Sequence, residues 1–65
     1  MKIKPRIREL RMEKHMTQIE LSAKLGIDQT QLSRYEKGRN LPGLETLMKM
    51  EEVFDCRLNE LYEYE

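Results

Sequence analysis

Cys56 and His15 are the side chains of this sequence best suited to nucleophilic catalysis or zinc binding, and each is the only residue of its type. A disulfide needs a pair of cysteines, and a zinc site usually needs several Cys or His ligands. No nucleophile with an adjacent base can be assembled from this set. We therefore expect no catalytic activity, no metal, no cofactor and no small-molecule ligand.

A second group of polar residues is suited to hydrogen bonding with a partner. Their spacing places them on the exposed face of a predicted helix: Gln29, Thr30, Ser33, Arg34 and Lys37. Amides and hydroxyls of this kind donate and accept hydrogen bonds, whereas the cations only donate them. An ordinary solvated helix surface has the same composition, so the surrounding motif must decide between the two interpretations.

The charges of the chain are unevenly distributed, although its net charge is zero. Residues 1–41 carry ten Lys or Arg against five Asp or Glu, whereas residues 42–65 carry two against seven. One end can therefore face a polyanion while the other end faces away from it.

Two short helices with well-marked ends follow each other in the middle of the sequence. Thr17 and Glu20 have the spacing of a capping box, in which each side chain accepts the backbone N–H of the other residue. Gly26 ends this helix, and Asp28 can cap the next one. So short a turn makes the two helices cross steeply, which predicts a helix-turn-helix unit over about residues 17–37.

Three further helices complete the predicted fold. The first begins at Pro5 and ends before His15, the fourth covers about 44–54, and the fifth covers about 58–62. No alternating apolar run is bounded by turn residues, so we expect no strand. The sequence predicts an all-α, compact five-helix fold, with one domain over residues 1–65.

The spacing within the helix-turn-helix unit satisfies several independent constraints. Ser22 supplies the small residue required where the two helices nearly touch, and Gly26 supplies the turn. The core positions of the unit are all apolar: Leu21, Leu25, Ile27, Leu32 and Tyr35. With these residues in place, the segments 17–27 and 32–38 resemble the phage-repressor and Cro-like (XRE-type) helix-turn-helix family. The resemblance continues through Pro42, Leu47, Phe54, Cys56, Leu61 and Tyr62.

The resemblance implies a DNA-binding transcription regulator in which the third helix enters the major groove. In that setting Gln29 pairs with adenine, and Thr30 meets a thymine methyl group or an acceptor. Arg34 lies one turn further along and can contact guanine O6 and N7, with Ser33 as an edge contact.

The same resemblance assigns contacts to the DNA backbone and one structural ion pair. The residues implied in phosphate binding are Gln18, Lys37, Arg39 and Asn40. Such contacts position the protein, whereas base contacts specify the site. Arg11 and Glu36 correspond to an ion pair that joins the first helix to the end of the third.

We expect a cytoplasmic, nucleoid-associated homodimer that binds double-stranded DNA and represses transcription. The sequence shows neither a membrane span nor a secretory signal. The apolar residues that we expect at the dimer interface are Val53, Leu58, Tyr62 and Tyr64.

A protein-interaction module is the alternative hypothesis. In that case the acidic C-terminal half would bind another regulator, as in an antitoxin or an antagonist that forms mixed dimers. Salt dependence discriminates between the two hypotheses, because DNA binding through several phosphates weakens steeply with salt.

Overall fold

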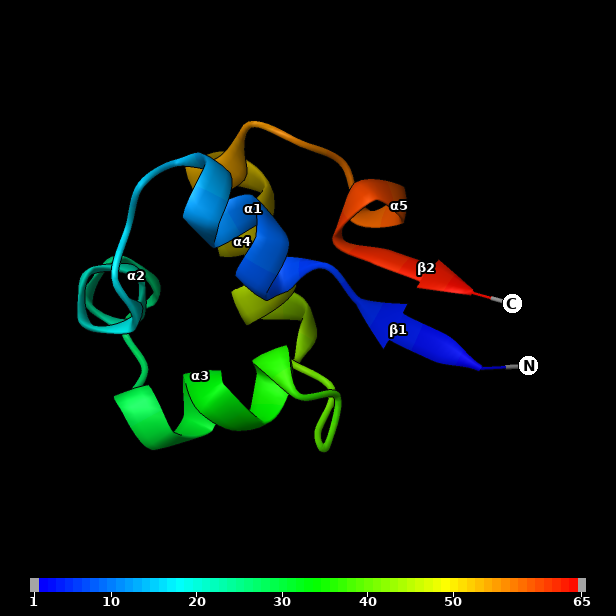
Figure 1. Ribbon diagram of the computed structural model, residues 1–65, viewed down its shortest axis with the longest axis horizontal. Coiled ribbons are helices and arrows are strands. Elements are labelled where there is room, and N and C mark those ends of the chain that lie inside the picture. The colour runs from blue at the N-terminus through cyan, green and yellow to red at the C-terminus, as the bar shows by residue number, and fades with distance from the viewer. Residues whose placement is uncertain (1, 65) are drawn as a thin grey trace.

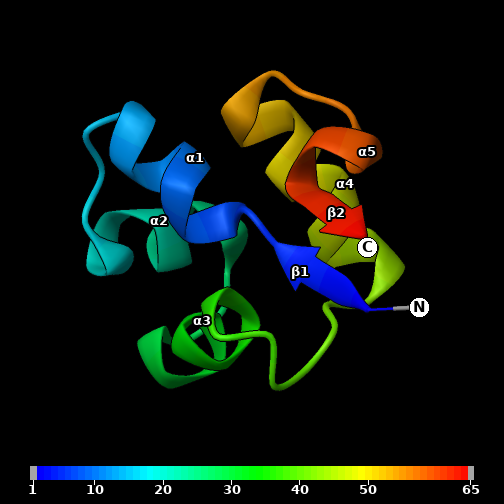
Figure 2. The same ribbon diagram turned by 45° about the vertical axis from the view of Figure 1, so that its right-hand side comes forward.

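The computed structural model describes residues 2–64 and contains five helices with a pair of short strands (Figure 1). The elements are β1 (Ile3–Pro5), α1 (Ile7–Glu13), α2 (Gln18–Leu25), α3 (Gln29–Glu36), α4 (Leu44–Phe54), α5 (Leu58–Leu61) and β2 (Tyr62–Tyr64). The predicted order of helices is therefore correct. In both views α3 borders the lower side of the molecule, whereas α5 lies at the upper right (Figures 1 and 2).

The ends of α2 and α3 are set by the local hydrogen bonds that the sequence predicts. Thr17 Oγ1 accepts the Glu20 backbone N–H at 3.1 Å, and Glu20 Oε1 accepts the Thr17 N–H at 2.9 Å. Gly26 ends α2 in the left-handed region with φ 72°. Asp28 Oδ1 then accepts the Gln31 N–H at 2.8 Å and begins α3. These contacts bring the two helices together as a helix-turn-helix unit.

The expectation that the chain contains no strand is wrong. β1 pairs with β2 in antiparallel register, with Ile3 opposite Tyr64 and Pro5 opposite Tyr62. Pro5 therefore belongs to a strand, and α1 begins after Arg6, whose backbone N–H donates to Leu61 O at 2.8 Å. Three-residue strands are too short to display an alternating pattern, and their partners lie at opposite ends of the sequence. The description all-α is thus approximate.

The fifth helix is shorter than predicted because Tyr62 belongs to β2, which pairs with β1. It ends at Leu61, and Tyr62 begins β2 with an extended backbone instead of extending the helix. At its other end, Glu60 Oε1 accepts the Arg57 backbone N–H at 3.1 Å.

The core lies between the helices and takes one or two apolar residues from each. Its buried members are Ile7, Leu21, Leu25, Leu32, Tyr35, Met50, Phe54 and Leu61. Four of the five apolar positions predicted for the helix-turn-helix unit are fully in this core, and Ile27 packs against it while half-buried. Ser22 is buried on α2, and its hydroxyl donates to Ile19 O at 3.0 Å. A tightly packed core on one side leaves the opposite face of α3 open to solvent.

Candidate nucleic-acid interface

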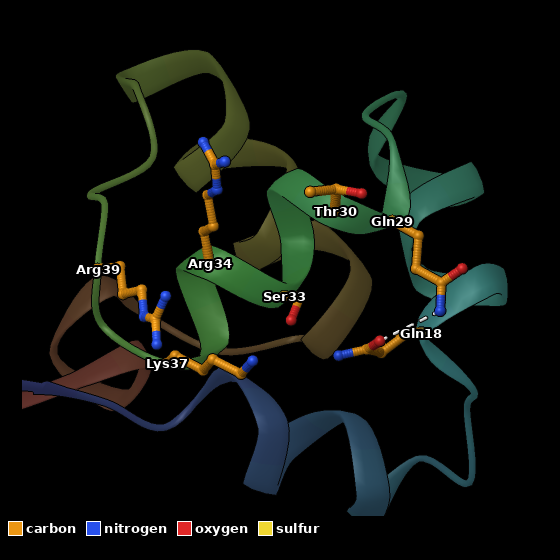
Figure 3. Close-up of a pocket in the computed structure, with 7 residues that line it drawn as sticks. All are labelled: Gln18, Gln29, Thr30, Ser33, Arg34, Lys37 and Arg39. Atoms are coloured by element: carbon orange, nitrogen blue, oxygen red, sulfur yellow. Dashed lines mark hydrogen bonds between the residues drawn. The ribbon is translucent and has the colours of Figure 1, made fainter.

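The exposed face of α3 forms one side of a shallow hollow of about 360 Å³, which we call the α3 hollow (Figure 3). Its lining consists of Gln18, Gln29, Thr30, Ser33, Arg34, Lys37 and Arg39. Seven of the eight side chains predicted from the sequence to contact DNA therefore lie together. Asn40, the eighth, is exposed in the loop after α3 and does not line the hollow.

The start of α3 determines which side chains reach the hollow. Because Asp28 caps the helix, Gln29 and Thr30 occupy the first turn and are exposed. Ser33 and Arg34 follow one turn later on the same face. Arg34 is exposed, whereas Ser33 is half-buried. The hollow thus presents amides and hydroxyls beside a guanidinium group.

A chain of hydrogen bonds connects this surface with the interior. Arg11 Nε donates to Glu36 Oε2 at 2.7 Å, and the two side chains are only 12% and 3% exposed. Glu36 Oε1 also accepts the Gln18 amide at 2.9 Å, and Gln18 Oε1 accepts Gln29 Nε2 at 3.2 Å. The Gln18–Gln29 bond is the dashed line in Figure 3. One N–H of the Gln29 amide is therefore engaged by Gln18, and the second N–H and the carbonyl oxygen are left for a partner.

The positive charge of the α3 hollow is not neutralised within the described chain. Among residues 2–64, no carboxylate lies within ion-pair distance of Arg34, Lys37 or Arg39. Figure 3 shows the Arg34 side chain pointing away from the Gln18–Gln29 pair. An open, cationic surface with hydrogen-bonding groups suits an extended anionic partner, whereas an enclosed apolar cavity is what a small ligand usually requires.

Neither Cys56 nor His15 lines the α3 hollow. Cys56 is half-buried against the core, and burial together with nearby carboxylates raises the pKa of its thiol. A protonated thiol is a poor nucleophile. His15 occupies an exposed turn with φ 57°, and residues 2–64 contain no group of three or more His, Cys, Asp or Glu able to hold a metal ion.

A family model described as Helix-turn-helix matches residues 7–61, which include all five helices. The chain belongs to the helix-turn-helix family. The resemblance found in the sequence is thereby confirmed, and the residues of the α3 hollow lie within the matched segment.

Several proteins of known name are similar to this helix-turn-helix chain. The cryptic phage CTXphi transcriptional repressor RstR of Vibrio cholerae is 34% identical over 94% of the chain, and the ImmF control region 10 kDa protein of Bacillus phage phi105 is 40% identical over 85%. The chain spans 54% and 61% of the lengths of these two relatives. An uncharacterized HTH-type transcriptional regulator of Archaeoglobus fulgidus is 37% identical over 92% of the chain and 86% of its own length.

A solved structure shares the architecture as well. The crystal structure of the restriction-modification controller protein C.AhdI from Aeromonas hydrophila matches with a TM-score of 0.77 and 30% identity. The match covers 86% of this chain and 85% of that one. No helix within residues 2–64 has the length and apolar character needed to cross a bilayer.

The predicted dimer residues of this helix-turn-helix protein fall into two groups. Leu58 and Tyr64 are 50% and 74% exposed, whereas Val53 and Tyr62 are half-buried against the core. Burial also raises the pKa of Tyr62, whose hydroxyl is enclosed without a hydrogen-bond partner among residues 2–64. Only the first group is therefore fully available to a partner.

A separate hollow of about 940 Å³, here called the ribbon hollow, contains three of these four residues. Its apolar lining is Ile3, Leu58, Tyr62 and Tyr64, and its polar lining is Glu51, Arg57, Asn59 and Glu63. Ile3 was not among the residues expected at the interface, because only the pairing of β1 with β2 brings it beside Tyr64. Val53 does not line this hollow.

Proposed function

We propose that this helix-turn-helix protein is a sequence-specific, double-stranded DNA-binding transcriptional regulator that acts as a repressor in the cytoplasm. The observation that carries the proposal is the α3 hollow, where three uncharged polar side chains of one α3 face lie with cations that have no carboxylate partner within residues 2–64. The major groove of B-DNA is wide enough to admit an α-helix and displays a distinct donor and acceptor pattern for each base pair. The names of the relatives RstR and C.AhdI, a repressor and a controller protein, support the same function.

Base reading is proposed for the exposed face of α3. Gln29 has one N–H and one carbonyl oxygen free, which is the combination that pairs with adenine N6 and N7. Thr30 offers its methyl group to thymine, and Arg34 can donate two hydrogen bonds to guanine O6 and N7. Ser33, which is half-buried, contributes an edge contact from the floor of the hollow.

Phosphate binding is proposed for the rim of the same hollow. Lys37, Arg39 and Asn40 follow α3 and are all exposed, so they can reach the DNA backbone beside the groove. Gln18 contributes in a different way, because both ends of its amide are already engaged by Glu36 and Gln29. Its backbone N–H, at the first position of α2, is the group left free for a phosphate.

Repression is proposed to need a homodimer. Leu58, Tyr64 and Ile3 offer exposed apolar area in the ribbon hollow, and pairing two copies would remove it from water. The rim is self-complementary in charge, since Arg57 of one copy can meet Glu51 or Glu63 of the other across a two-fold axis. Such a dimer would occupy two half-sites about 34 Å apart and exclude the polymerase from a near-palindromic operator.

The test is a selection of bound sequences from a random duplex library at about physiological salt. We expect a short palindromic consensus whose two halves lie about one helical turn apart. The double variant Gln29→Ala/Arg34→Ala is the matched control, because both side chains are exposed and their removal should leave the fold intact. A folded wild-type protein that enriches no sequence, or the same sequences as the control, would contradict the proposal.

A protein-interaction module remains the second candidate function, and the ribbon hollow is the observation that favours it. Its apolar floor and partly acidic rim would suit another regulator in a mixed dimer, as for an antitoxin or an antagonist. Duplex binding that falls steeply with salt supports the regulator, whereas no duplex binding at low salt supports the module.

A further inference from the structure

A third hollow, of about 650 Å³, lies between α1 and α3 and includes a cation to which no role has been given. We call it the α1 hollow; Arg8 lines it from α1, Gln18 and Ile19 from α2, and Ser33 and Lys37 from α3 and its end. Gln18, Gln29, Ser33 and Lys37 also line the α3 hollow, so the two hollows adjoin each other. A molecule that lies along α3 therefore passes the mouth of the α1 hollow.

The α1 hollow has an excess of positive charge that comes from two separate elements. Its charged residues are Arg8, Arg11, Glu36 and Lys37. Arg11 and Glu36 neutralise each other through two contacts at 2.7 and 3.3 Å. Arg8 and Lys37 remain, both exposed, and no carboxylate within residues 2–64 lies at ion-pair distance from either. The other acidic group near the start of α1, Glu9, is engaged by Arg6 at 2.8 Å.

Backbone donors from α2 open onto the same place. The Thr17 N–H is used by Glu20, but the N–H groups of Gln18 and Ile19 belong to the first turn of α2 and have no partner within the helix. The N-terminal end of a helix is favourable for an anion. Two cations and two N–H groups without a partner inside the helix therefore belong to residues that line one hollow.

We propose that Arg8 is a further phosphate-binding residue, which holds one DNA backbone phosphate together with Lys37 over the first turn of α2. The guanidinium of Arg8 can donate two parallel hydrogen bonds to a phosphate, and Lys37 adds a second positive charge from the opposite side. The contact extends the DNA footprint from α3 onto α1 and is independent of base sequence. This inference rests on the proposed function, because it requires a duplex along α3.

The experiment measures duplex affinity of the wild type, Arg8→Ala and Lys24→Ala between about 50 and 200 mM salt. Lys24 is an equally charged, exposed residue of α2 that lines none of the three hollows, so it controls for the loss of one positive charge. Loss of one phosphate contact per subunit should lower the slope of log K against log salt by about 0.9 for each bound copy of Arg8→Ala, or about 1.8 for a dimer, and weaken binding about fivefold per copy near physiological salt. The loss should be equal on the selected operator and on a random duplex, and Lys24→Ala should resemble the wild type.

Two results would overturn the proposal, and they are distinguishable. Suppose that the wild type binds DNA and that Arg8→Ala has the same salt slope as the wild type or as Lys24→Ala. Arg8 then contacts no phosphate, and the proposed function still stands. If the folded wild type binds no duplex at low salt, both the function and this inference fail. Thermal melting of Arg8→Ala should match that of the wild type, because the side chain has no hydrogen-bond partner within residues 2–64.

Discussion

At the scale of single residues, the most consequential contact in the proposed interface is the one between Gln18 and Gln29. Their amides bond at 3.2 Å, and Gln18 is itself held by Glu36, which is 3% exposed. The family resemblance predicted separate contacts to DNA for these two residues. That they contact each other could not be predicted, because they lie on different helices and no local pattern joins them.

This contact changes what is expected of Gln18→Ala. The substitution leaves the backbone N–H of the first α2 residue in place but removes the group that orients the Gln29 amide. We expect a loss of about 0.5–1.5 kcal/mol of discrimination at one base pair, the usual net value of one hydrogen bond. Affinities for the operator and for a variant at that base pair give the measurement. Equal weakening on every duplex would instead mean that the side chain acts on phosphate.

Arg34→Ala should act on specificity without acting on the fold. The guanidinium is exposed and has no carboxylate partner within residues 2–64, so the melting temperature should stay that of the wild type. Loss of a bidentate guanine contact should weaken operator binding by about 1–3 kcal/mol and relax the choice at one base pair. Arg39→Ala serves as the comparison and should weaken all duplexes alike. A large fall in the melting temperature of Arg34→Ala would show that Arg34 is structural.

At the scale of elements, the sequence was most informative where a structural signal is confined to a few neighbouring residues. The caps at Thr17 and Asp28 and the left-handed turn at Gly26 act within one helical turn, and all three are present in the structure. β1 and β2 were missed because their stability depends on a partner at the other end of the chain. The start of α1 was then misplaced, since Pro5 is suited to a first helical turn and to an edge strand alike.

The capping box of α2 predicts how stability depends on pH. The Glu20 carboxylate accepts the backbone N–H of Thr17. This bond, together with the contact between the carboxylate and the Thr17 hydroxyl, holds the pKa of Glu20 below its ordinary value of 4.5. Because the pKa is lower in the folded state, this stabilisation is complete above about pH 4.5 and is lost as the pH falls through the folded pKa. Glu20→Gln cannot titrate, so its melting temperature should fall less steeply on acidification than that of the wild type.

The control for this measurement is Glu52→Gln, since Glu52 is exposed and makes no side-chain hydrogen bond within residues 2–64. Its melting curve against pH should run parallel to that of the wild type. If Glu20→Gln and Glu52→Gln give the same dependence, the capping box does not contribute to acid sensitivity.

At the scale of the whole molecule, two faces of different character lie in separate places. The α3 hollow is polar and cationic, whereas the ribbon hollow has an apolar floor and a rim with two carboxylates and one guanidinium. The excess of Lys and Arg in residues 1–41 agrees with the cationic α3 hollow, whose lining residues all lie in that part of the chain. The sequence did not show which apolar residues are available, because Val53 and Tyr62 pack inward and Ile3 joins the surface through strand pairing. On the proposed function, a copy bound to DNA through α3 would keep its ribbon hollow free for a second copy.

Leu58→Lys tests whether the ribbon hollow joins two copies. Leu58 is already 50% exposed, so a lysine there should leave the monomer folded while placing a charge in the middle of an apolar interface. We expect the wild type to sediment as a dimer and the variant as a monomer. Affinity for a palindromic operator should fall by roughly 10²-fold in the variant, because two linked half-sites bind far more tightly than one. Affinity for a single half-site should be unchanged.

Met48→Lys is the matched control for this prediction, since Met48 is 56% exposed on α4 and lies outside the ribbon hollow. The same net charge change there should leave the dimer and operator binding intact. A dimer that survives Leu58→Lys would place the interface elsewhere on the molecule. Equal loss in both variants would mean that added positive charge, and not the ribbon hollow, governs association. Loss in Leu58→Lys alone would assign the interface to the ribbon hollow, a face that Ile3 reaches only through the pairing of β1 with β2.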